Sequence, residues 1–357
     1  MRDYIYNLAH DKKNDSLFRI TKAFLLVLSF FYGLAVWFVK ACYRYKIFRK
    51  YSLGCKVISV GNITWGGTGK TPAVEYIARK LSGQGRKVAI LSRGYGKRGT
   101  RDEGRGTNYE TMGDEPYMLK KNLPEIPVLV GRDRIKNGTL AIKEYGADVI
   151  ILDDGFQHWR VRRDLEIVVI DSTNPIGNGR LIPRGILRED ILSLDRAGVF
   201  LLSKVNLTSR GCVEALRERL NRINPRAVIA EAIHSPCGLY DFSGASRSFD
   251  SLRGAKLSIL SSIAEPDSFK KVILGLAAEI CLEFKFADHY AYKEEDLGKI
   301  FEACRQKDLK TLITTEKDAA RLGFLKNKKL PLDLLVLRIE LKVIQNEEEF
   351  LQRLFSF

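Results

Sequence analysis

The sequence predicts an α/β protein built on a doubly wound, mostly parallel sheet, and three observations carry this prediction. Short apolar segments alternate with stretches of helical period along most of the 357 residues. A glycine-rich turn at 57–72 joins a strand to a helix, and an apolar strand at 148–155 contains two adjacent aspartates. A glycine turn of this kind, followed later by an acidic strand end, is typical of phosphate-loop nucleotide-binding folds.

Three segments are expected along the chain. Residues 1–50 form an N-terminal helical segment, residues 51–235 a phosphate-loop core, and residues 236–357 a smaller α/β domain. The core strands are expected at 57–60, 87–91, 126–130, 148–155, 166–171 and 199–202, with a helix at 139–145. The later strands are expected at 256–261, 282–286, 311–314 and 334–339, with helices at 266–278 and 294–307.

The composition limits the classes of function. The chain is 45% hydrophobic and 29% charged, which is a globular rather than a disordered composition. A net charge of +16 predicts an acidic partner, such as nucleic acid, anionic lipid or a phosphorylated substrate. The six cysteines contain no CxxC pair, so neither a metal knuckle nor a disulfide framework is expected.

The N-terminal segment is expected to associate with a membrane. Residues 1–50 hold ten Lys or Arg and three Asp, and the uncharged run at 23–39 lies between Lys22 and Lys40. This run could span a bilayer, lie in the interface, or form a buried helix of the protein. Its apolar side chains cover every face of the helix, and Trp37 suits the headgroup region, so the sequence favours the membrane.

The stretch at 57–72, VISVGNITWGGTGKTP, reads as a nucleotide phosphate-binding loop. Consecutive backbone N–H groups can face an anion there, Lys70 can reach the terminal phosphates, and the Thr71 hydroxyl can bind Mg²⁺. Thr64 departs from the strict pattern, which has glycine at that position. The predicted nucleotide-binding residues are Gly66, Gly67, Thr68, Gly69, Lys70 and Thr71.

The strand DVIILDDG at 148–155 supplies the second element of such a site. A carboxylate at the end of this strand can hold Mg²⁺ or its waters, and the adjacent Asp153 and Asp154 point in different directions. Either of the two could therefore be the metal ligand. The stretch at 203–206, SKVN, lacks the signature of guanine-binding proteins, which favours ATP as the nucleotide.

Two further polar turns are candidates for acid–base chemistry. The stretch GDEP at 113–116 introduces a helix, and its acids also suit simple capping at the positive helix end. His289 is one of four histidines and lies in the polar turn at 287–290, where either a structural or an acid–base role is open. The basic, glycine-rich stretch that extends to about Gly106 is either a solvated hairpin or a loop that faces phosphate or headgroups.

Together these pieces resemble the lipid A 4′-kinases, the tetraacyldisaccharide 4′-kinases of Gram-negative bacteria. Seven motifs occur in the order typical of that family. They are VGNITWGGTGKTP (60–72), ILSRGYG (90–96), GDEP (113–116), LDDGFQH (152–158), LRE (187–189), ADHY (287–290) and TEKD (315–318).

The resemblance implies transfer of the ATP γ-phosphoryl group to the 4′-hydroxyl of tetraacyldisaccharide 1-phosphate at the cytoplasmic face of the inner membrane. It implies Mg²⁺ as cofactor, an anionic acylated disaccharide and the membrane surface as partners, no nucleic acid, and a C-terminal domain that closes over the active site. Asp114 would take the hydroxyl proton, paired with His289 from the other domain. Lys70 would act on the phosphates, Arg134 and Arg188 would lie around the nucleotide, and the metal ligands would be Thr71, Asp153, Asp154 and Glu189.

The sequence departs from the family at two places. The family's PAGPLREP reads PRGILRED at 183–190, and its SGIA reads SSIA at 261–264. The first change affects the loop that carries Arg188 and Glu189. A membrane-tethered phosphate-loop ATPase and a nucleotide-binding adaptor remain the alternatives, and neither requires an acid–base pair such as Asp114 and His289.

Overall fold

The computed structural model describes residues 16–94, 112–325 and 328–356, with the side chains of 16–18 left out. These residues form two compact units. Unit 1 contains the described parts of Met1–Arg93, Ile126–Ile233 and Val343–Phe357, and unit 2 those of Gly94–Glu125 and His234–Lys342. The predicted basic loop that extends to Gly106, and the last two residues of the motif at 90–96, lie outside the described residues.

This division differs from the predicted domains, because the described part of the predicted N-terminal segment at 1–50 belongs to unit 1 and two other segments change unit. The helix α5 (Asp114–Asn122) belongs to unit 2, because it packs against α10 (Glu316–Arg321). The C-terminal helix α11 (Glu347–Phe355) belongs to unit 1, where Phe350 stacks on Tyr76 and Glu347 accepts a hydrogen bond from the Tyr76 hydroxyl (2.6 Å). Neither packing partner is close in sequence.

The sheet of unit 1 is parallel and has the strand order β3-β2-β4-β1-β5-β6-β7. The predicted doubly wound α/β fold is confirmed. The first strand, β1, lies between β4 and β5, so the strand order reverses there, and such a reversal is where open α/β sheets bind ligands. The strands are β1 (Lys56–Gly61), β2 (Val88–Ser92), β3 (Val128–Val130), β4 (Val149–Asp153), β5 (Leu165–Asp171), β6 (Val199–Ser203) and β7 (Val228–Asp241).

Two apolar clusters hold the helices α6 (Arg134–Tyr145) and α7 (Arg210–Ile223) to this sheet, and α3 (Lys70–Gly83) packs on β1, β2 and β4. Every residue of β4 is buried, as expected for a strand covered on both faces. Helix α6 begins five residues before its predicted start, because the Asp133 side chain accepts hydrogen bonds from the backbone N–H groups of Ile135 and Lys136. A 3₁₀ turn at Ile191–Arg196 precedes β6.

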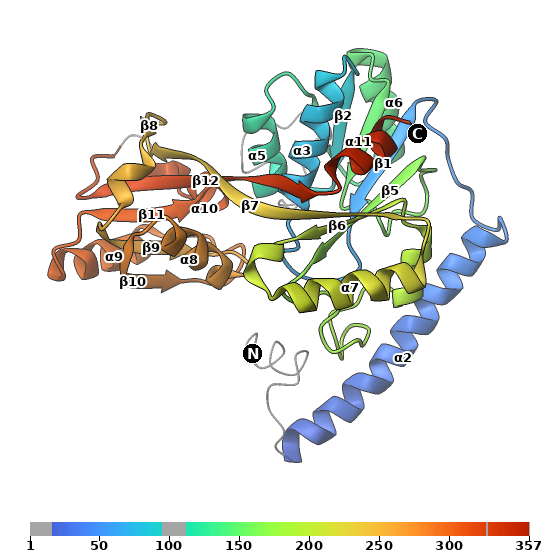
Figure 1. Ribbon diagram of the computed structural model, residues 1–357, viewed down its shortest axis with the longest axis horizontal. Coiled ribbons are helices and arrows are strands. Elements are labelled where there is room, and N and C mark those ends of the chain that lie inside the picture. Colours follow the sequence, from blue (N-terminus) through green and yellow to red (C-terminus); the bar gives the residue numbers. More distant parts are fainter. Residues whose placement is uncertain (1–15, 95–111, 326–327, 357) are drawn as a thin grey trace. The chain divides into compact units, whose positions relative to one another are not determined.

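The N-terminal helix α2 (Ser16–Arg44) is one continuous helix, drawn in blue in Figure 1. It is long and apolar enough to cross a membrane, and only 6% of its most apolar window is buried. The side chains of Phe24, Phe30, Phe31, Trp37 and Phe38 are 59% to 68% exposed. The alternative of a helix buried in the protein core is therefore wrong.

One side of α2 contacts the segment at 181–193. The Ser29 hydroxyl donates to the Leu181 carbonyl (2.8 Å), and the Tyr32 hydroxyl donates to the Arg188 carbonyl (2.9 Å). Lys40 Nζ donates to the Ser193 hydroxyl (2.6 Å). These polar contacts join α2 directly to the loop that carries Arg188 and Glu189.

Unit 2 contains a second parallel sheet segment with the order β10-β9-β11-β12. Its strands are β9 (Lys256–Ser261), β10 (Glu279–Lys285), β11 (Thr311–Thr315) and β12 (Asp333–Gln345), and a short strand β8 (Ser246–Arg247) pairs antiparallel with the end of β7. Its helices are α8 (Pro266–Gly275), α9 (Glu294–Gln306), α5 and α10. Two apolar clusters fill the space between the sheet and the helices α8 and α9, and α5 packs against α10.

Candidate active site

The predicted phosphate loop follows β1 and ends where α3 begins. Gly66 and Gly69 have φ angles of 132° and 87°, a backbone region that side chains with a Cβ rarely adopt. The Asn62 side chain holds the loop from inside, because its amide donates to the Thr64 carbonyl (2.8 Å) and to the Thr68 hydroxyl (3.1 Å). Thr64 therefore accepts a loop-stabilising hydrogen bond through its backbone, and this bond does not require glycine at that position.

Lys70 is the first residue of α3, and its ammonium group lies among acceptors. Lys70 Nζ donates to the Asn62 side-chain oxygen (3.3 Å) and lies 3.5 Å from Asp154 Oδ1. Arg188 Nη1 binds the same carboxylate, at 3.1 and 2.9 Å from its two oxygens. The structure thus brings three predicted site residues, Lys70, Asp154 and Arg188, into one ion-pair cluster beside the loop.

Charge in this cluster stabilises the ionised form of Asp154. Burial alone raises the pKa of Asp154, but the nearby cations Lys70 and Arg188 outweigh it, and the net pKa is lowered. Asp154 also has a φ of 52°, which turns its side chain away from the direction of β4. The group is therefore an anion at neutral pH that pairs with both Lys70 and Arg188.

Asp153, the last residue of β4, has different partners. Its Oδ2 accepts a hydrogen bond from the Ser92 hydroxyl at the end of β2 (2.8 Å). Arg134 donates to the Asp153 carbonyl (3.2 Å) and to the Gly131 carbonyl (2.8 Å) and is itself buried. Burial lowers the pKa of Arg134 to about 10, against the opposing effect of the aspartates. As predicted, the adjacent aspartates point in different directions. Arg134 stabilises the end of β4 through its hydrogen bond to the Asp153 carbonyl.

The oxygen donors at this edge suit Mg²⁺. Thr71 is buried in the first turn of α3. Asp153 ends β4, which pairs directly with β1, and Asp154 follows it. Within the described ranges, no group of three His, Cys, Asp or Glu side chains could hold a metal ion by itself. Mg²⁺ is usually held by one or two carboxylates together with substrate phosphates, so this donor set fits an ion that binds with the nucleotide.

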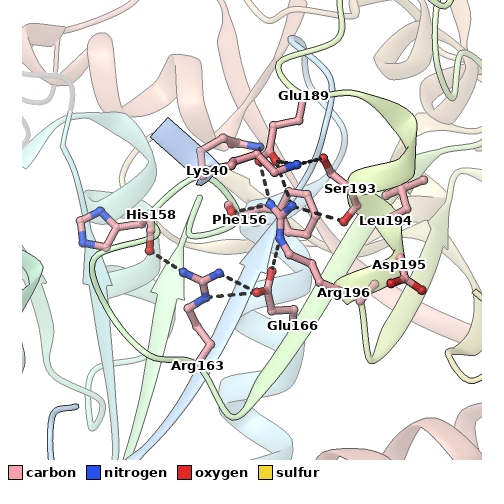
Figure 2. Close-up of polar contacts among 12 residues, drawn as sticks. Lys40, Phe156, His158, Arg163, Glu166, Glu189, Ser193, Leu194, Asp195 and Arg196 are labelled. Atoms are coloured by element: carbon pink, nitrogen blue, oxygen red, sulfur yellow. Dashed lines mark hydrogen bonds and ion pairs between the residues drawn. The ribbon is translucent and has the colours of Figure 1, made fainter. Parts of the chain in front are cut away.

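Glu189 lies instead in a separate ion-pair cluster (Figure 2). Its buried carboxylate accepts two hydrogen bonds from Arg196 (2.7 and 2.8 Å) and one from the Gln157 amide (3.1 Å). Lys40 of α2 is 3.5 Å from the same carboxylate. Figure 2 also shows Arg196 reaching Glu166, which in turn accepts from Arg163. This geometry gives Glu189 a structural role, and its predicted metal ligation has no support in these contacts.

Sequence reasoning missed a group that supports the phosphate loop from β6. Lys204 Nζ forms a buried ion pair with Asp171 and donates to the Gly67 carbonyl (2.8 Å). The Ser203 hydroxyl donates to the Thr68 carbonyl (2.8 Å). The signal was present, because Asp171 and Ser203 both end buried strands and the ends of adjacent parallel strands meet at one edge.

The second set of predicted residues lies within unit 2. His289 Nδ1 is 2.9 Å from Asp114 Oδ2, so the predicted pair is formed. The expectation that the two residues come from different domains is wrong, because α5 carries Asp114 in the same unit as His289. His289 has a φ of 60°, and its backbone N–H donates to the Ser262 carbonyl (3.2 Å). This turn directs the imidazole to α5.

The contact between Asp114 and His289 shifts the pKa of both side chains. Burial raises the pKa of Asp114, but the hydrogen bond with His289 and the charge of Arg321 lower it to about 2. The hydrogen bond to Asp114 raises the pKa of His289 above its ordinary value, against the effect of burial. Asp114 is therefore ionised across the physiological range and can only accept hydrogen bonds, so His289 Nδ1 carries the hydrogen between them.

Arg321 is the functional candidate that sequence reasoning missed in unit 2. It ends α10 and binds Asp114 Oδ2 through both Nε (2.7 Å) and Nη2. The spacing held a signal, since Asp318 and Arg321 are three residues apart on one helix and lie on the same face. This spacing does not indicate Asp114 as a partner of Arg321, because Asp114 is 207 residues away along the chain.

Comparisons with known proteins identify the family to which this chain belongs. The family model described as tetraacyldisaccharide-1-P 4′-kinase matches residues 21–356. A tetraacyldisaccharide 4′-kinase from Halothermothrix orenii is 37% identical over 341 residues, which cover 90% of this chain and 88% of that protein. A tetraacyldisaccharide 4′-kinase from Syntrophus aciditrophicus is 38% identical over 333 residues, with 89% and 88% covered.

A solved structure shares the fold. The structure of LpxK from Aquifex aeolicus in complex with ATP has a TM-score of 0.71 to this chain at 27% identity. The match covers 94% of this chain and 99% of the other. The resemblance seen in the seven motifs is thereby confirmed over nearly the whole length, and the chain belongs to the tetraacyldisaccharide-1-P 4′-kinase family.

Proposed function

We propose that this protein transfers the γ-phosphoryl group of ATP to the 4′-hydroxyl of a tetraacyldisaccharide 1-phosphate. The observation that carries the proposal is a phosphate loop with Lys70 at its helix start, in a chain that matches this kinase family over residues 21–356. The products are the 1,4′-bisphosphorylated lipid and ADP. The solved relative was crystallised with ATP, which supports ATP as the donor here.

At the nucleotide, the proposed work of the protein is positioning and charge neutralisation. The backbone N–H groups of 66–69 hold the phosphates, and Lys70 and Arg188 exchange their contacts with Asp154 for contacts with phosphate oxygens. Mg²⁺, held by the Thr71 hydroxyl and the aspartates 153 and 154, would neutralise charge on the phosphates. Lys204, which pairs with Asp171, stabilises the conformation of the phosphate loop because its Nζ donates to the Gly67 carbonyl.

At the acceptor, we propose that the imidazole of His289 takes the proton. The family resemblance implied Asp114 for this role, but a carboxyl group with a pKa of about 2 is a weak base at neutral pH. His289 Nδ1 is bound to Asp114, and His289 Nε2 accepts the proton of the 4′-hydroxyl. At the same time the oxygen of that hydroxyl bonds to the γ-phosphorus of ATP. The bond from that phosphorus to the bridging oxygen breaks, and ADP leaves with the electron pair. Asp114 orients the imidazole and stabilises its cation.

We further propose that α2 places the protein at the cytoplasmic face of a bacterial inner membrane. ATP is available on that side, and the acyl chains of the acceptor stay in the bilayer. The exposed aromatic and aliphatic side chains of α2 supply an apolar surface. Arg44 ends the helix, and Lys46, Arg49 and Lys50 follow it. The contacts of Ser29, Tyr32 and Lys40 with 181–193 leave those apolar side chains exposed.

Polar substitution of the exposed face of α2 is expected to release the protein from membranes. Phe30→Asp combined with Phe38→Asp removes apolar area and adds charge without touching Ser29, Tyr32 or Lys40. The measurement is co-sedimentation with phosphatidylethanolamine–phosphatidylglycerol vesicles, in which the variant should stay in the supernatant. Leu274→Asp, at another exposed apolar position, on α8, is the control and should sediment like the wild type. Unchanged sedimentation of the double variant would assign membrane binding to another surface.

The function itself is tested by following the label of [γ-³²P]ATP in mixed micelles with tetraacyldisaccharide 1-phosphate. The expected result is one labelled lipid per ADP formed. The same lipid with a 4′-deoxy sugar should stay unlabelled, which would assign the acceptor atom. ADP formation without lipid labelling would favour the ATPase alternative, and ATP binding without turnover would favour the adaptor.

A further inference from the structure

Arg321 is a buried residue to which the proposed reaction assigns no role so far. Its side chain is 1% exposed, and all three guanidinium nitrogens face acceptors. Nε (2.7 Å) and Nη2 bind Asp114 Oδ2, while Nη1 binds Asp318 Oδ1 (3.1 Å), the Ser262 carbonyl (2.9 Å) and the Ser262 hydroxyl. Nη2 also lies 3.3 Å from His289 Nδ1. One oxygen of Asp114 thus meets both Arg321 and His289.

We propose that Arg321 is a positioning residue for the phosphoryl transfer: its planar fork fixes the Asp114 carboxylate in the orientation that holds the His289 imidazole. The inference rests on the proposed function, because it gives a role in that reaction to a residue that does not touch the substrate. A lysine could supply the same charge but not two donors in one plane, so the shape of the guanidinium matters.

On the side of Arg321 away from Asp114, which we call its far side, Nη1 contacts Asp318 and Ser262, and hydrogen bonds hold these two residues in place as well. Asp318 accepts from the Ser262 backbone N–H (3.1 Å), from the Tyr292 hydroxyl (3.0 Å) and from the Thr315 hydroxyl (2.7 Å). Ser262 stands where the family motif has glycine, and its hydroxyl adds a further link to Asp318 and Arg321. The same Ser262 carbonyl accepts from the His289 backbone N–H. Arg321 and the His289 turn are therefore tied to one point at the end of β9.

The charges in this cluster favour a protonated imidazole. Two buried carboxylates, Asp114 and Asp318, share one buried guanidinium, which leaves one negative charge in excess. When His289 takes a proton, the four groups become neutral together. Asp288, 3.8 Å from His289 Nε2, and the neighbouring Lys317–Glu115 ion pair are the other charged groups that face the pair. Without Arg321, Asp114 would be a buried anion that lacks the two hydrogen bonds that fix the orientation of its carboxylate.

The experiment compares Arg321→Lys and Arg321→Met with the wild type under saturating ATP and lipid. Because misplacement by about 1 Å can cost roughly 10²-fold in rate, kcat is expected to fall about 10²-fold in Arg321→Met and about 10-fold in Arg321→Lys. The KM for ATP should stay within about twofold, since the phosphate loop is untouched. Arg305→Met on α9, which removes an exposed arginine paired with Glu302, is the control and should leave kcat unchanged.

A pH profile separates positioning from general support of the fold. The charge of Arg321 lowers the pKa of both Asp114 and His289, so its loss should raise both. The acid limb of kcat should therefore move to higher pH in Arg321→Met and stay near the wild-type position in Arg321→Lys. Asp318→Asn and Ser262→Ala loosen the far side only, and we expect smaller losses of kcat from them.

A double-mutant cycle gives the decisive outcome. If Arg321 acts through Asp114, Arg321→Met should lose little further activity in an Asp114→Asn background. Equal losses in both backgrounds, or a wild-type kcat in Arg321→Lys and Arg321→Met, would overturn the proposal. An inactive wild type would instead reject the proposed function. Circular dichroism melting accompanies each variant, and Arg321→Lys preserves the test if Arg321→Met does not fold.

Discussion

Replacement of Lys70 by alanine is expected to reduce lipid phosphorylation by at least about 10²–10³-fold, the cost typical of losing one preorganised charge donor. Lys70 Nζ lies between Asn62 and Asp154 at the start of α3, where the proposed phosphates bind. Its charge is needed most when negative charge spreads over the transferring phosphoryl group. The measurement is transfer of label from ATP to the lipid under single-turnover conditions.

Lys80→Ala is the matched control, because Lys80 lies on the same helix and pairs with Glu347 at the surface. It should keep wild-type turnover. The melting temperature of Lys70→Ala should remain close to that of the wild type, since Arg188 still pairs with Asp154 when Lys70 is removed. Near-normal transfer by Lys70→Ala would remove the assignment of 57–72 as the nucleotide site.

The second large effect is expected at the acid–base pair. Asp114→Asn and His289→Ala should each lower kcat by about 10²–10⁴-fold, the range typical of general base catalysis, with little change in ATP affinity. The double variant should be only slightly worse than either single variant, because the two side chains act as one unit. Asp267→Asn, which removes a surface acid paired with Lys285, should have no effect.

The pH dependence gives an independent reading of the same pair. His289 must be neutral to accept the proton, so activity should fall as the pH drops through its pKa. The hydrogen bond to Asp114 raises that pKa, which places the acid limb of the wild type above the ordinary histidine value. Asp114→Asn removes this effect and should move the acid limb to lower pH. Multiplicative losses in the double variant, or an acid limb that does not move, would argue against a coupled pair.

The nucleotide half of the site could be predicted from sequence because it is local. A strand, a glycine turn and a helix start follow one another within 57–72, and the backbone conformation of that stretch depends on its own residues. The carboxyl ends of parallel strands meet at one edge, so Asp153 and Asp154 could be placed near the loop without a structure. The unbroken apolar run at 23–39 likewise predicted a helix that the fold leaves exposed.

Residues that act through distant partners could not be assigned in this way. The motif around Glu189 suggested a metal ligand, yet its carboxylate is enclosed by Arg196, Gln157 and Lys40. Lys204 looked only like a failed guanine signature, while the fold uses it to hold the phosphate loop. In both cases the role of the side chain depends on which charged group the neighbouring element presents.

By itself, the sequence determined the α/β class, the phosphate loop with Lys70 and Thr71, the second-strand aspartates and the apolar N-terminal helix. The tertiary structure alone decided that Asp114 and His289 lie in one unit, that α5 packs on α10, and that Arg321 binds the Asp114 carboxylate. The physical reason is that local periodicity and turn chemistry act over a few residues. A buried charge is compensated by whatever group the fold brings beside it, here one that is 207 residues away along the chain.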